Sequence, residues 1–391
     1  MTSAAVADPF ACFGSDDDDS VDSTTADSDH HHHGTTPNLK QQQQQQVLEH
    51  AEIARNLVQQ SNDSTETADD RLIQRYPISR PTSFEVFDLP QTKDNPGPCK
   101  GLRATKVFLQ GEEIMRETAV MRIPNHQAAS SADEAKRKHQ SAVWKSFQGL
   151  HPTTQKEFMD LSSCKEPADA KTPHGVYDTN SYCLTGEAET SDNLDEVVPV
   201  LGGLFLTVAR MNHSCRPSAT HFWRPDLEQT VVFASRDIAI GEELCTRYGP
   251  ADCLPTAGRR DFLDHHFAFW CQCSMCAEEE TDTGGDARML EIQSLQEDID
   301  LLASTGKSAL ALTAVQTCLT LLEQQGIGYG VFTKPILRFG YEMSLATKDY
   351  MGAHKYLSEE LLAVQQSEGV DSPRALQIEN EITRYKSIPL I

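Results

Sequence analysis

Basic residues are scarce in this chain. Its 391 residues include 34 Lys and Arg against 58 Asp and Glu, which gives a formal net charge of -24 at pH 7. No basic stripe offsets this excess, so the sequence argues against direct binding to duplex nucleic acid. The charge would suit a basic peptide partner, although net charge alone is weak evidence for one.

Long apolar runs are also missing. No stretch approaches the roughly 18 apolar residues of a transmembrane helix, so no membrane contact is expected. The N-terminus has no charged segment followed by an apolar one, so a secretory signal is not expected either. We therefore expect the chain in the nucleus, the cytoplasm or both. Its 11 cysteines should then lie in a reducing compartment.

The first part of the chain lacks the apolar periodicity of a folded domain. Residues 1–70 hold 14 Asp and Glu but only two basic residues, and runs of Asp, His and Gln follow one another up to residue 46. Such a composition cannot bury enough apolar surface to offset the entropy lost on ordering. We predict that residues 1–80 form a disordered, acidic and Gln-rich tail.

The remaining sequence predicts an α+β fold. Ordered structure is expected from near Ser83, with a strand over 84–89 and a further extended pair up to Pro124. Residues 125–200 are polar and partly helical, and we interpret them as an insertion. Residues 200–212 are apolar and compatible with a helix, and short strands return between Ser218 and Tyr248.

Helical periodicity dominates after Cys276, so residues 277–391 are predicted to be all-α. Two apolar faces are expected, and one hairpin of antiparallel helices should turn at Lys348-Asp349. The hairpin resembles a degenerate tetratricopeptide repeat, but without a clean 34-residue period a plain helical bundle is equally acceptable. These helices could bind protein partners. The residues of the two faces are Leu290, Leu295, Ile299 and Leu302, then Leu310, Leu312, Val315, Leu319 and Leu322.

Three cysteines are packed as Cys271-x-Cys273-x-x-Cys276. In reducing surroundings this spacing favours a metal over disulfides. A structural zinc site needs four ligands, so a fourth must come from elsewhere in the chain. The nearby candidates are Cys215, Cys253, Cys245 and His213.

Three motifs in a fixed order carry a resemblance to a known family. They are Met211-Asn-His-Ser-Cys-Arg-Pro217, Gly241-Glu-Glu-Leu-Cys-Thr-Arg-Tyr-Gly249 and Phe267-Ala-Phe-Trp-Cys-Gln-Cys-Ser-Met-Cys276. Together they resemble the core of the SET-domain protein lysine methyltransferases. The insertion lacks the Cys/His set of a MYND finger. The chain is therefore most similar to a stand-alone protein of the SET/MYND-like branch without that finger.

The resemblance implies a SET domain over residues 81–276 with a knot-like crossing and a post-SET cysteine loop. It also implies two ligands, S-adenosylmethionine and Zn²⁺. The zinc ligands would be Cys215, Cys271, Cys273 and Cys276. The residues implied in cofactor binding are Lys100, Gly101, Leu102, Asn180, Asn212, His213, Tyr248 and Phe269.

The same resemblance assigns the chemistry to Tyr248 and Phe267, which would line the channel for the substrate lysine of a histone or another protein. A phenol oxygen can orient a methyl group through weak C–H···O contacts, but with a pKa near 10 it is a poor base at neutral pH. Phe267 stands where close relatives often have a tyrosine. Cys99 and Ser218 are two further departures, because relatives usually have Gly and Asn there.

These departures leave an alternative open. The chain could be a catalytically weak or inactive SET module that binds peptides or proteins as a scaffold. A third interpretation assigns the useful surfaces to the helical C-terminal region and the acidic tail. Binding of S-adenosylmethionine and transfer of a methyl group distinguish the three.

Overall fold

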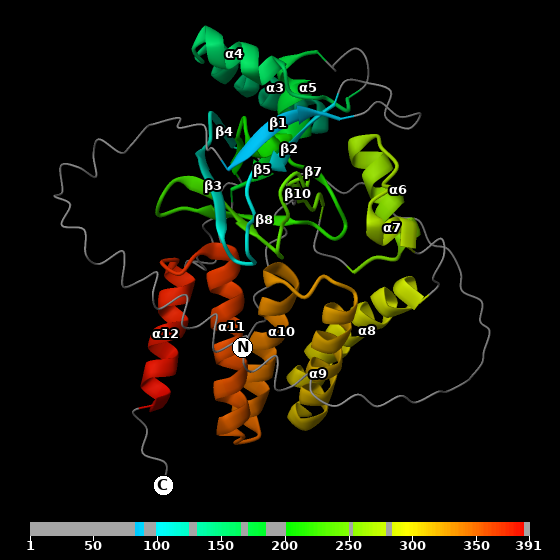
Figure 1. Ribbon diagram of the computed structural model, residues 1–391, viewed down its shortest axis with the longest axis vertical. Helices are drawn as coiled ribbons and strands as arrows, with labels where there is room; N and C mark the ends of the chain where they lie inside the picture. Colours follow the sequence, from blue (N-terminus) through cyan, green and yellow to red (C-terminus); the bar gives the residue numbers. More distant parts are fainter. Residues whose placement is uncertain are drawn as a thin grey trace, which may run out of the picture. The chain divides into compact units, whose positions relative to one another are not determined.

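The computed structural model is α+β, as the sequence predicted (Figure 1). Short sheets are followed by a helical C-terminal region. The predicted tail over residues 1–80 lies outside the described residues. The structure describes residues 83–89, 99–124, 131–165, 171–184, 201–249, 253–278 and 284–386.

A hairpin-like pair opens the described part of the chain. The strands β1 (Phe84–Asp88) and β2 (Lys100–Ala104) are antiparallel, with Phe84 opposite Ala104. The predicted strand over 84–89 is therefore confirmed. Leu102 and Ala104 are buried from β2, whereas Arg103 between them is exposed, which is the alternation of a half-buried strand.

A second sheet has the strand order β3-β9-β8 and is antiparallel throughout. Its central strand is buried along nearly its whole length, because the sequence QTVVFA offers apolar side chains to both faces. The helix α11 (Tyr350–Glu368) packs against this sheet. The strands are β3 (Glu113–Thr118), β8 (Ala219–Arg224) and β9 (Gln229–Ala234).

A third sheet corrects the helix expected over 200–212. Residues Leu201–Leu204 form β6, which pairs antiparallel with β4 (Met121–Pro124) and β5 (Ser181–Cys183). Only one turn of 3-10 helix, η1 (Val208–Arg210), follows. The two central glycines explain the difference. A Cβ on Gly202 would lie 2.6 Å from the Tyr177 hydroxyl oxygen, and one on Gly203 would lie 2.7 Å from the Leu184 side chain.

The described residues of the predicted insertion form three helices (Figure 1). The Ser131 hydroxyl caps the first of them by accepting from the Glu134 N–H, and the Thr172 hydroxyl caps the third by accepting from the Gly175 N–H. Their apolar sides share a core with β4 and β6 that is built around Val143, Phe158 and Tyr177. The helices are α3 (Ala132–Gln148), α4 (Pro152–Met159) and α5 (Pro173–Asn180).

The described part of the C-terminal region contains five longer helices, and each packs against the next one along the chain (Figure 1). The helices α10 and α11 meet at residues 347–349, which confirms the predicted hairpin. The bounds are α8 (Gly284–Ser304), α9 (Ser308–Gln324), α10 (Gly330–Ala346), α11 (Tyr350–Glu368) and α12 (Pro373–Lys386).

The prediction that Leu290 and Leu310 belong to the apolar helix faces is wrong. Leu290 is 53% exposed and Leu310 is 59% exposed. At about 100° per residue, Leu290 lies opposite Ile299 on α8, and the buried side of that helix runs instead through Met289 and Ile292. The other predicted residues of the two faces are buried or packed against the core.

An ion-pair cluster joins the C-terminal helices to the sheet of β8 and β9. Arg224, at the end of β8, is only 2% exposed. Its guanidinium lies 3.0 Å from the Asp371 carboxylate, between α11 and α12, and 2.7 Å from the Asp226 carboxylate. A buried cation is tolerated only when it is paired, so these carboxylates fix the contact between the two regions.

Candidate active site and cysteine cluster

Four cysteines from two distant segments converge. Cys271, Cys273 and Cys276 lie between α6 (Thr256–Phe267) and the end of α7 (Ser274–Glu278). Cys215 follows the short strand β7 (Asn212–His213). The four Sγ atoms all lie within 4.8 Å of one another, so they form a group that can hold a metal ion. Among the fourth ligands that the sequence left open, Cys215 joins this group in the described residues.

The sulfur spacing fits a tetrahedral site. Cys215 Sγ lies 3.9 Å from Cys271 Sγ and 3.6 Å from Cys276 Sγ. A Zn–S bond of about 2.3 Å in a regular tetrahedron separates the sulfurs by about 3.8 Å, whereas a disulfide requires about 2.05 Å. Hydrogen bonds from the neighbouring thiols, Cys215 first, lower the pKa of Cys273 and favour the thiolate form that binds metals.

The side chain of Arg259 compensates the charge that such a site would carry. It is buried on α6, and its guanidinium donates to Cys276 Sγ at 3.5 Å. The same guanidinium donates to the Leu254 carbonyl at 2.7 Å and to the Thr256 hydroxyl at 2.8 Å. A cation fixed in this way stabilises neighbouring thiolates.

His213 lies between the cysteine cluster and Tyr248, the tyrosine near the end of the second motif. The Tyr248 N–H donates to His213 Nδ1 at 2.9 Å, so Nδ1 carries no proton. Burial lowers the pKa of His213 to about 3, and the ring is therefore neutral with its proton on Nε2. That nitrogen lies 3.2 Å from Cys215 Sγ and donates to it. One imidazole thus links the cluster to the backbone of Tyr248.

The hydroxyl of Tyr248 has a fixed donor direction. It donates to the Met211 carbonyl at 2.8 Å. Burial raises the pKa of Tyr248 well above its usual 10, so the phenol stays protonated at neutral pH. With its single proton committed to Met211, the oxygen can act on another group only as an acceptor.

Tyr248 and Phe267 are brought together at a small pocket, and their ring centroids lie 4.9 Å apart. Asn180 belongs to the same pocket, where its Nδ2 donates to the carbonyls of Ser162 at 2.7 Å and Val176 at 2.8 Å. None of the described residues that line the pocket carries a charge. They are Thr179, Asn180, Ser181, Tyr182, Ala209, Tyr248 and Phe267.

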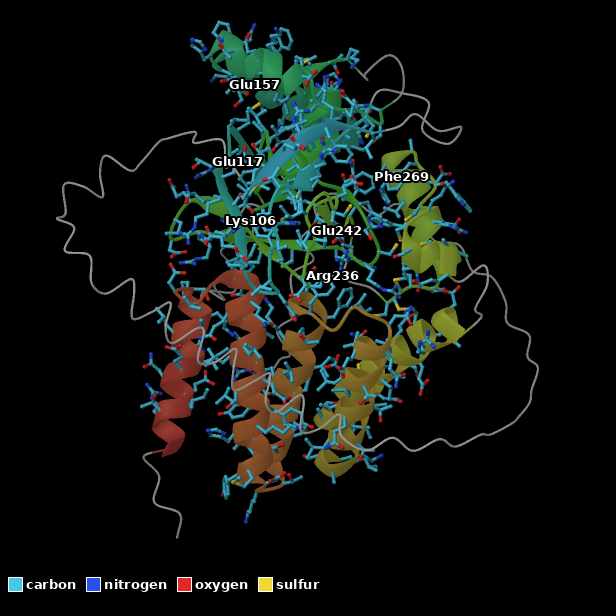
Figure 2. All side chains as sticks on the ribbon, in the orientation of Figure 1. Lys106, Glu117, Glu157, Arg236, Glu242 and Phe269 are labelled. Carbon is cyan, nitrogen blue, oxygen red and sulfur yellow. The ribbon has the colours of Figure 1, made fainter. Side chains whose placement is uncertain are left out.

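Phe269 lies near His213 and Tyr248. Ala268 between the two phenylalanines adopts a left-handed conformation, with φ of 55°, which ends α6 and turns the chain. The Phe269 ring then lies 5.9 Å from the His213 ring and 6.4 Å from the Tyr248 ring. Figure 2 labels the Phe269 side chain.

The segment that contains Lys100, Gly101 and Leu102 meets Asn212. The Asn212 Nδ2 donates to the Lys100 carbonyl at 3.2 Å. The Lys100 ammonium points elsewhere and pairs with Asp160 at 2.6 Å, where Arg210 joins the same carboxylate at 3.1 Å. Leu102 is fully buried in the core, so its backbone alone can face a ligand.

Ser218, which stands where relatives usually have Asn, has a local structural role. The Ser218 hydroxyl donates to the Glu243 carbonyl at 2.9 Å and accepts from the Cys245 N–H at 2.9 Å. It therefore holds the start of β10 (Cys245–Thr246), which runs parallel to β7 with Cys245 opposite Asn212. A serine performs this bridging task without the larger amide of an asparagine.

Sequence reasoning missed several residues of this region. Tyr182 and Ala209 line the pocket, Asp160 binds the side chain of Lys100, and Glu243 contacts Asn212. Glu243 carried a signal, because it lies within the Gly-Glu-Glu-Leu motif five residues before Tyr248. Asp160 carried none, since it lies in the insertion.

Comparisons with known proteins identify a SET domain in this chain. A family model for the SET domain matches residues 100–249. Histone-lysine N-methyltransferase set5 of Schizosaccharomyces pombe is 47% identical over 79 residues, which cover 20% of this chain and 24% of that protein. SET domain-containing protein SmydA-8 of Drosophila melanogaster is 30% identical over 200 residues, covering 50% and 37%. Human N-lysine methyltransferase SMYD2 is 38% identical over 90 residues, covering 22% and 20%.

The fold and the matched segment together define a SET domain over residues 100–249. The relatives that the chain resembles over part of its length are named as lysine methyltransferases. The matched segments span well under half of the length of these relatives. In the part of the chain that the structure describes, no helix combines the length and the apolarity required to cross a membrane.

Proposed function

We propose that this chain transfers a methyl group from S-adenosylmethionine to the side-chain nitrogen of a lysine in a protein substrate. The observation that carries the proposal is the uncharged pocket at which Tyr248 and Phe267 meet, next to the Asn212-His213 strand. The names of the relatives point to the same chemistry.

The pocket suits a lysine that must react as a neutral amine. An ammonium loses hydration on entering an uncharged, aromatic site, and desolvation lowers its pKa. The aromatic faces of Tyr248 and Phe267 can also meet the methylated cation that forms. No described residue that lines the pocket is a base, so the amine would release its proton to water before it is enclosed.

The proposed cofactor residues fit a ligand with donor groups. In the described part of the chain, the amide oxygen of Asn212 contacts only the Cys99 thiol, at 3.8 Å, and so has acceptor capacity left. When bound, S-adenosylmethionine would supply a methyl group on a positively charged sulfur. Tyr248 would orient that group with its oxygen lone pairs, Phe269 would stack on the adenine, and Asn180 would contact the methionine part.

Zn²⁺ is the metal that we propose for the cysteine cluster. Four sulfur ligands at tetrahedral spacing favour zinc, and a site with no open position is structural. Cys215 would then tie the post-SET cysteines to the strand that carries Asn212 and His213. The metal has no direct part in methyl transfer.

The class of substrate that we propose is a lysine side chain in a protein. Relatives named as histone-lysine and protein-lysine methyltransferases support a protein substrate, histone or non-histone, that carries the lysine. We further propose action in the nucleus or the cytoplasm, without nucleic acid or membrane binding, and protein partners for the C-terminal helices.

Two measurements test the proposed function. S-adenosylmethionine at 100 times its dissociation constant should stabilise the folded chain by about 2.7 kcal/mol, which appears as a higher melting temperature. Incubation with labelled cofactor and a panel of histones and other cellular proteins should then label lysine. Binding without transfer would favour the inactive SET module, and a chain that shows neither contradicts both.

Replacement of Phe267 by Tyr should shift the products toward lower methylation states. The new hydroxyl would lie at the pocket beside Tyr248, where it can hold a partly methylated nitrogen by a hydrogen bond and occupy space that further methyl groups need. Mass spectrometry of the product peptide measures the ratio of methylation states.

The matched control is Phe158→Tyr, in the core of the insertion. There an unpaired phenol should cost about 1–3 kcal/mol of stability and leave the product ratio unchanged. If Phe267→Tyr also loses stability while its product ratio stays that of the unmodified chain, the channel role of Phe267 is wrong.

A further inference from the structure

A carboxylate lies behind the proposed cofactor residue Asn212. The Asn212 Nδ2 donates to Glu243 Oε1 at 2.8 Å and to the Lys100 carbonyl at 3.2 Å. These two bonds use both hydrogens of the amide. They also decide which way the amide points, because only its NH₂ end can face two acceptors. The oxygen end is therefore directed away from Glu243.

The glycine beside this pair makes room for it. A Cβ on Gly101 would lie 2.8 Å from Glu243 Oε1 and 2.9 Å from Asn212 Nδ2. A further 3.0 Å contact would form with the Phe87 ring. Real Cβ atoms rarely approach so closely, so a larger residue would push the carboxylate and the amide apart. The absence of a side chain at Gly101 is thus required first of all by the protein side chains beside it.

The main chain of Glu243 is held from two sides. Its carbonyl accepts from the Ser218 hydroxyl at 2.9 Å, and Glu243 forms an antiparallel bridge with Arg103. The next residue, Leu244, donates to the Leu102 carbonyl at 2.8 Å. The carboxylate therefore starts from a fixed backbone position, which limits the places that its oxygens can reach.

We infer that Glu243 is a positioning residue for the cofactor, which holds the Asn212 amide with its oxygen toward the bound ligand. The inference rests on the proposed function, because it assigns Asn212 to the cofactor. Burial raises the pKa of Glu243, and the hydrogen bond from Asn212 opposes that shift. Among the described residues, the side chain that donates a hydrogen bond to this half-buried carboxylate is that of Asn212. The carboxylate can therefore act on the orientation of the Asn212 amide.

Two substitutions separate position from charge. Glu243→Asp keeps the charge but withdraws the carboxylate by one methylene group, beyond hydrogen-bond reach of Asn212. Glu243→Gln removes the charge but keeps an oxygen that can accept from Nδ2. We expect the Asp variant to bind S-adenosylmethionine about tenfold more weakly, and the Gln variant to bind within about threefold of the unmodified chain. Calorimetric titration measures both affinities, and melting curves confirm that each variant is folded.

Steady-state kinetics and a double-mutant cycle give two further measurements. A purely structural role of Glu243 would not produce the results expected from them. Glu243→Asp should raise the KM for S-adenosylmethionine and leave kcat at saturation nearly unchanged. Asn212→Ala should weaken binding by itself, and adding Glu243→Asp to it should have no further effect, because Glu243 acts through Asn212.

The neighbouring glutamate provides the matched control. Glu242 pairs with Arg236 at 2.6 Å, and Figure 2 labels both side chains. Glu242 also accepts from the Ala239 N–H. Glu242→Gln should therefore leave the affinity for S-adenosylmethionine unchanged.

The outcomes distinguish this inference from the proposed function. If the unmodified chain does not bind S-adenosylmethionine, or Asn212→Ala binds it normally, the cofactor site is wrong and the inference fails with it. If Asn212→Ala weakens binding but Glu243→Asp does not, only the role of Glu243 is wrong. Losses that add in the double variant, or an equal loss in the Gln and Asp variants, also overturn it.

Discussion

Replacement of Cys215 by Ser should abolish stoichiometric zinc binding and lower the melting temperature by at least about 5 °C. The reason is that, in the proposed zinc site, Cys215 would join Cys271, Cys273 and Cys276 to the strand of Asn212 and His213. A structural zinc ion binds with on the order of 10 kcal/mol of apparent free energy at pH 7, and each kcal/mol corresponds to about 2–4 °C in a domain of this size. Metal analysis and calorimetry measure the two effects.

The same variant should also lose methyl transfer. Without the proposed zinc, Cys215 is no longer tied to the other three cysteines. The His213 imidazole, which lies 3.2 Å from Cys215 Sγ and accepts from the Tyr248 N–H, then loses its fixed support. Chelation of the metal from the unmodified chain should have the same effect, with recovery when zinc is returned.

Cys253→Ser is the matched control for this experiment, because Cys253 is equally buried and was one of the alternative fourth ligands. It should retain about one zinc per chain. The assignment fails if Cys215→Ser keeps its zinc, or if the unmodified chain folds normally with no zinc and all its thiols free.

Replacement of Tyr248 by Phe should reduce methyl transfer at least about tenfold and change the affinity for S-adenosylmethionine little. The lost oxygen is the acceptor that faces the transferring methyl group in the proposed reaction, and tenfold corresponds to about 1.4 kcal/mol of transition-state stabilisation. The hydrogen bond to the Met211 carbonyl is lost as well, which should cost about 1 kcal/mol of stability. Steady-state kinetics and a melting curve separate the two effects.

Tyr356→Phe gives the corresponding control, because it removes a buried hydroxyl from α11 in the helical region. Its methyl transfer should equal that of the unmodified chain. Equal activity of the Tyr248→Phe variant would remove Tyr248 from the mechanism and leave the ring as a wall of the pocket.

The sequence by itself determined those features that depend on neighbours along the chain. The alternation over 84–89 predicted β1, and the periodicity around Lys348-Asp349 predicted the hairpin of α10 and α11. The spacing of Cys271, Cys273 and Cys276 predicted a cysteine group that can hold a metal ion, and the three ordered motifs predicted the SET domain that a family model matches over residues 100–249. In each case the signal is local, because a strand, a helix or a ligand loop repeats or closes within a few residues.

Only the tertiary structure decided which distant groups meet. Residues 201–204 form a strand because Tyr177 and Leu184 approach Gly202 and Gly203 closely, and no pattern within the segment encodes those neighbours. The side chain of Lys100 turns to Asp160, sixty residues away, and Glu243 meets Asn212 across thirty-one residues. Such contacts depend on how sheets and helices pack, and periodicity along the chain carries no information about the partner on the other side.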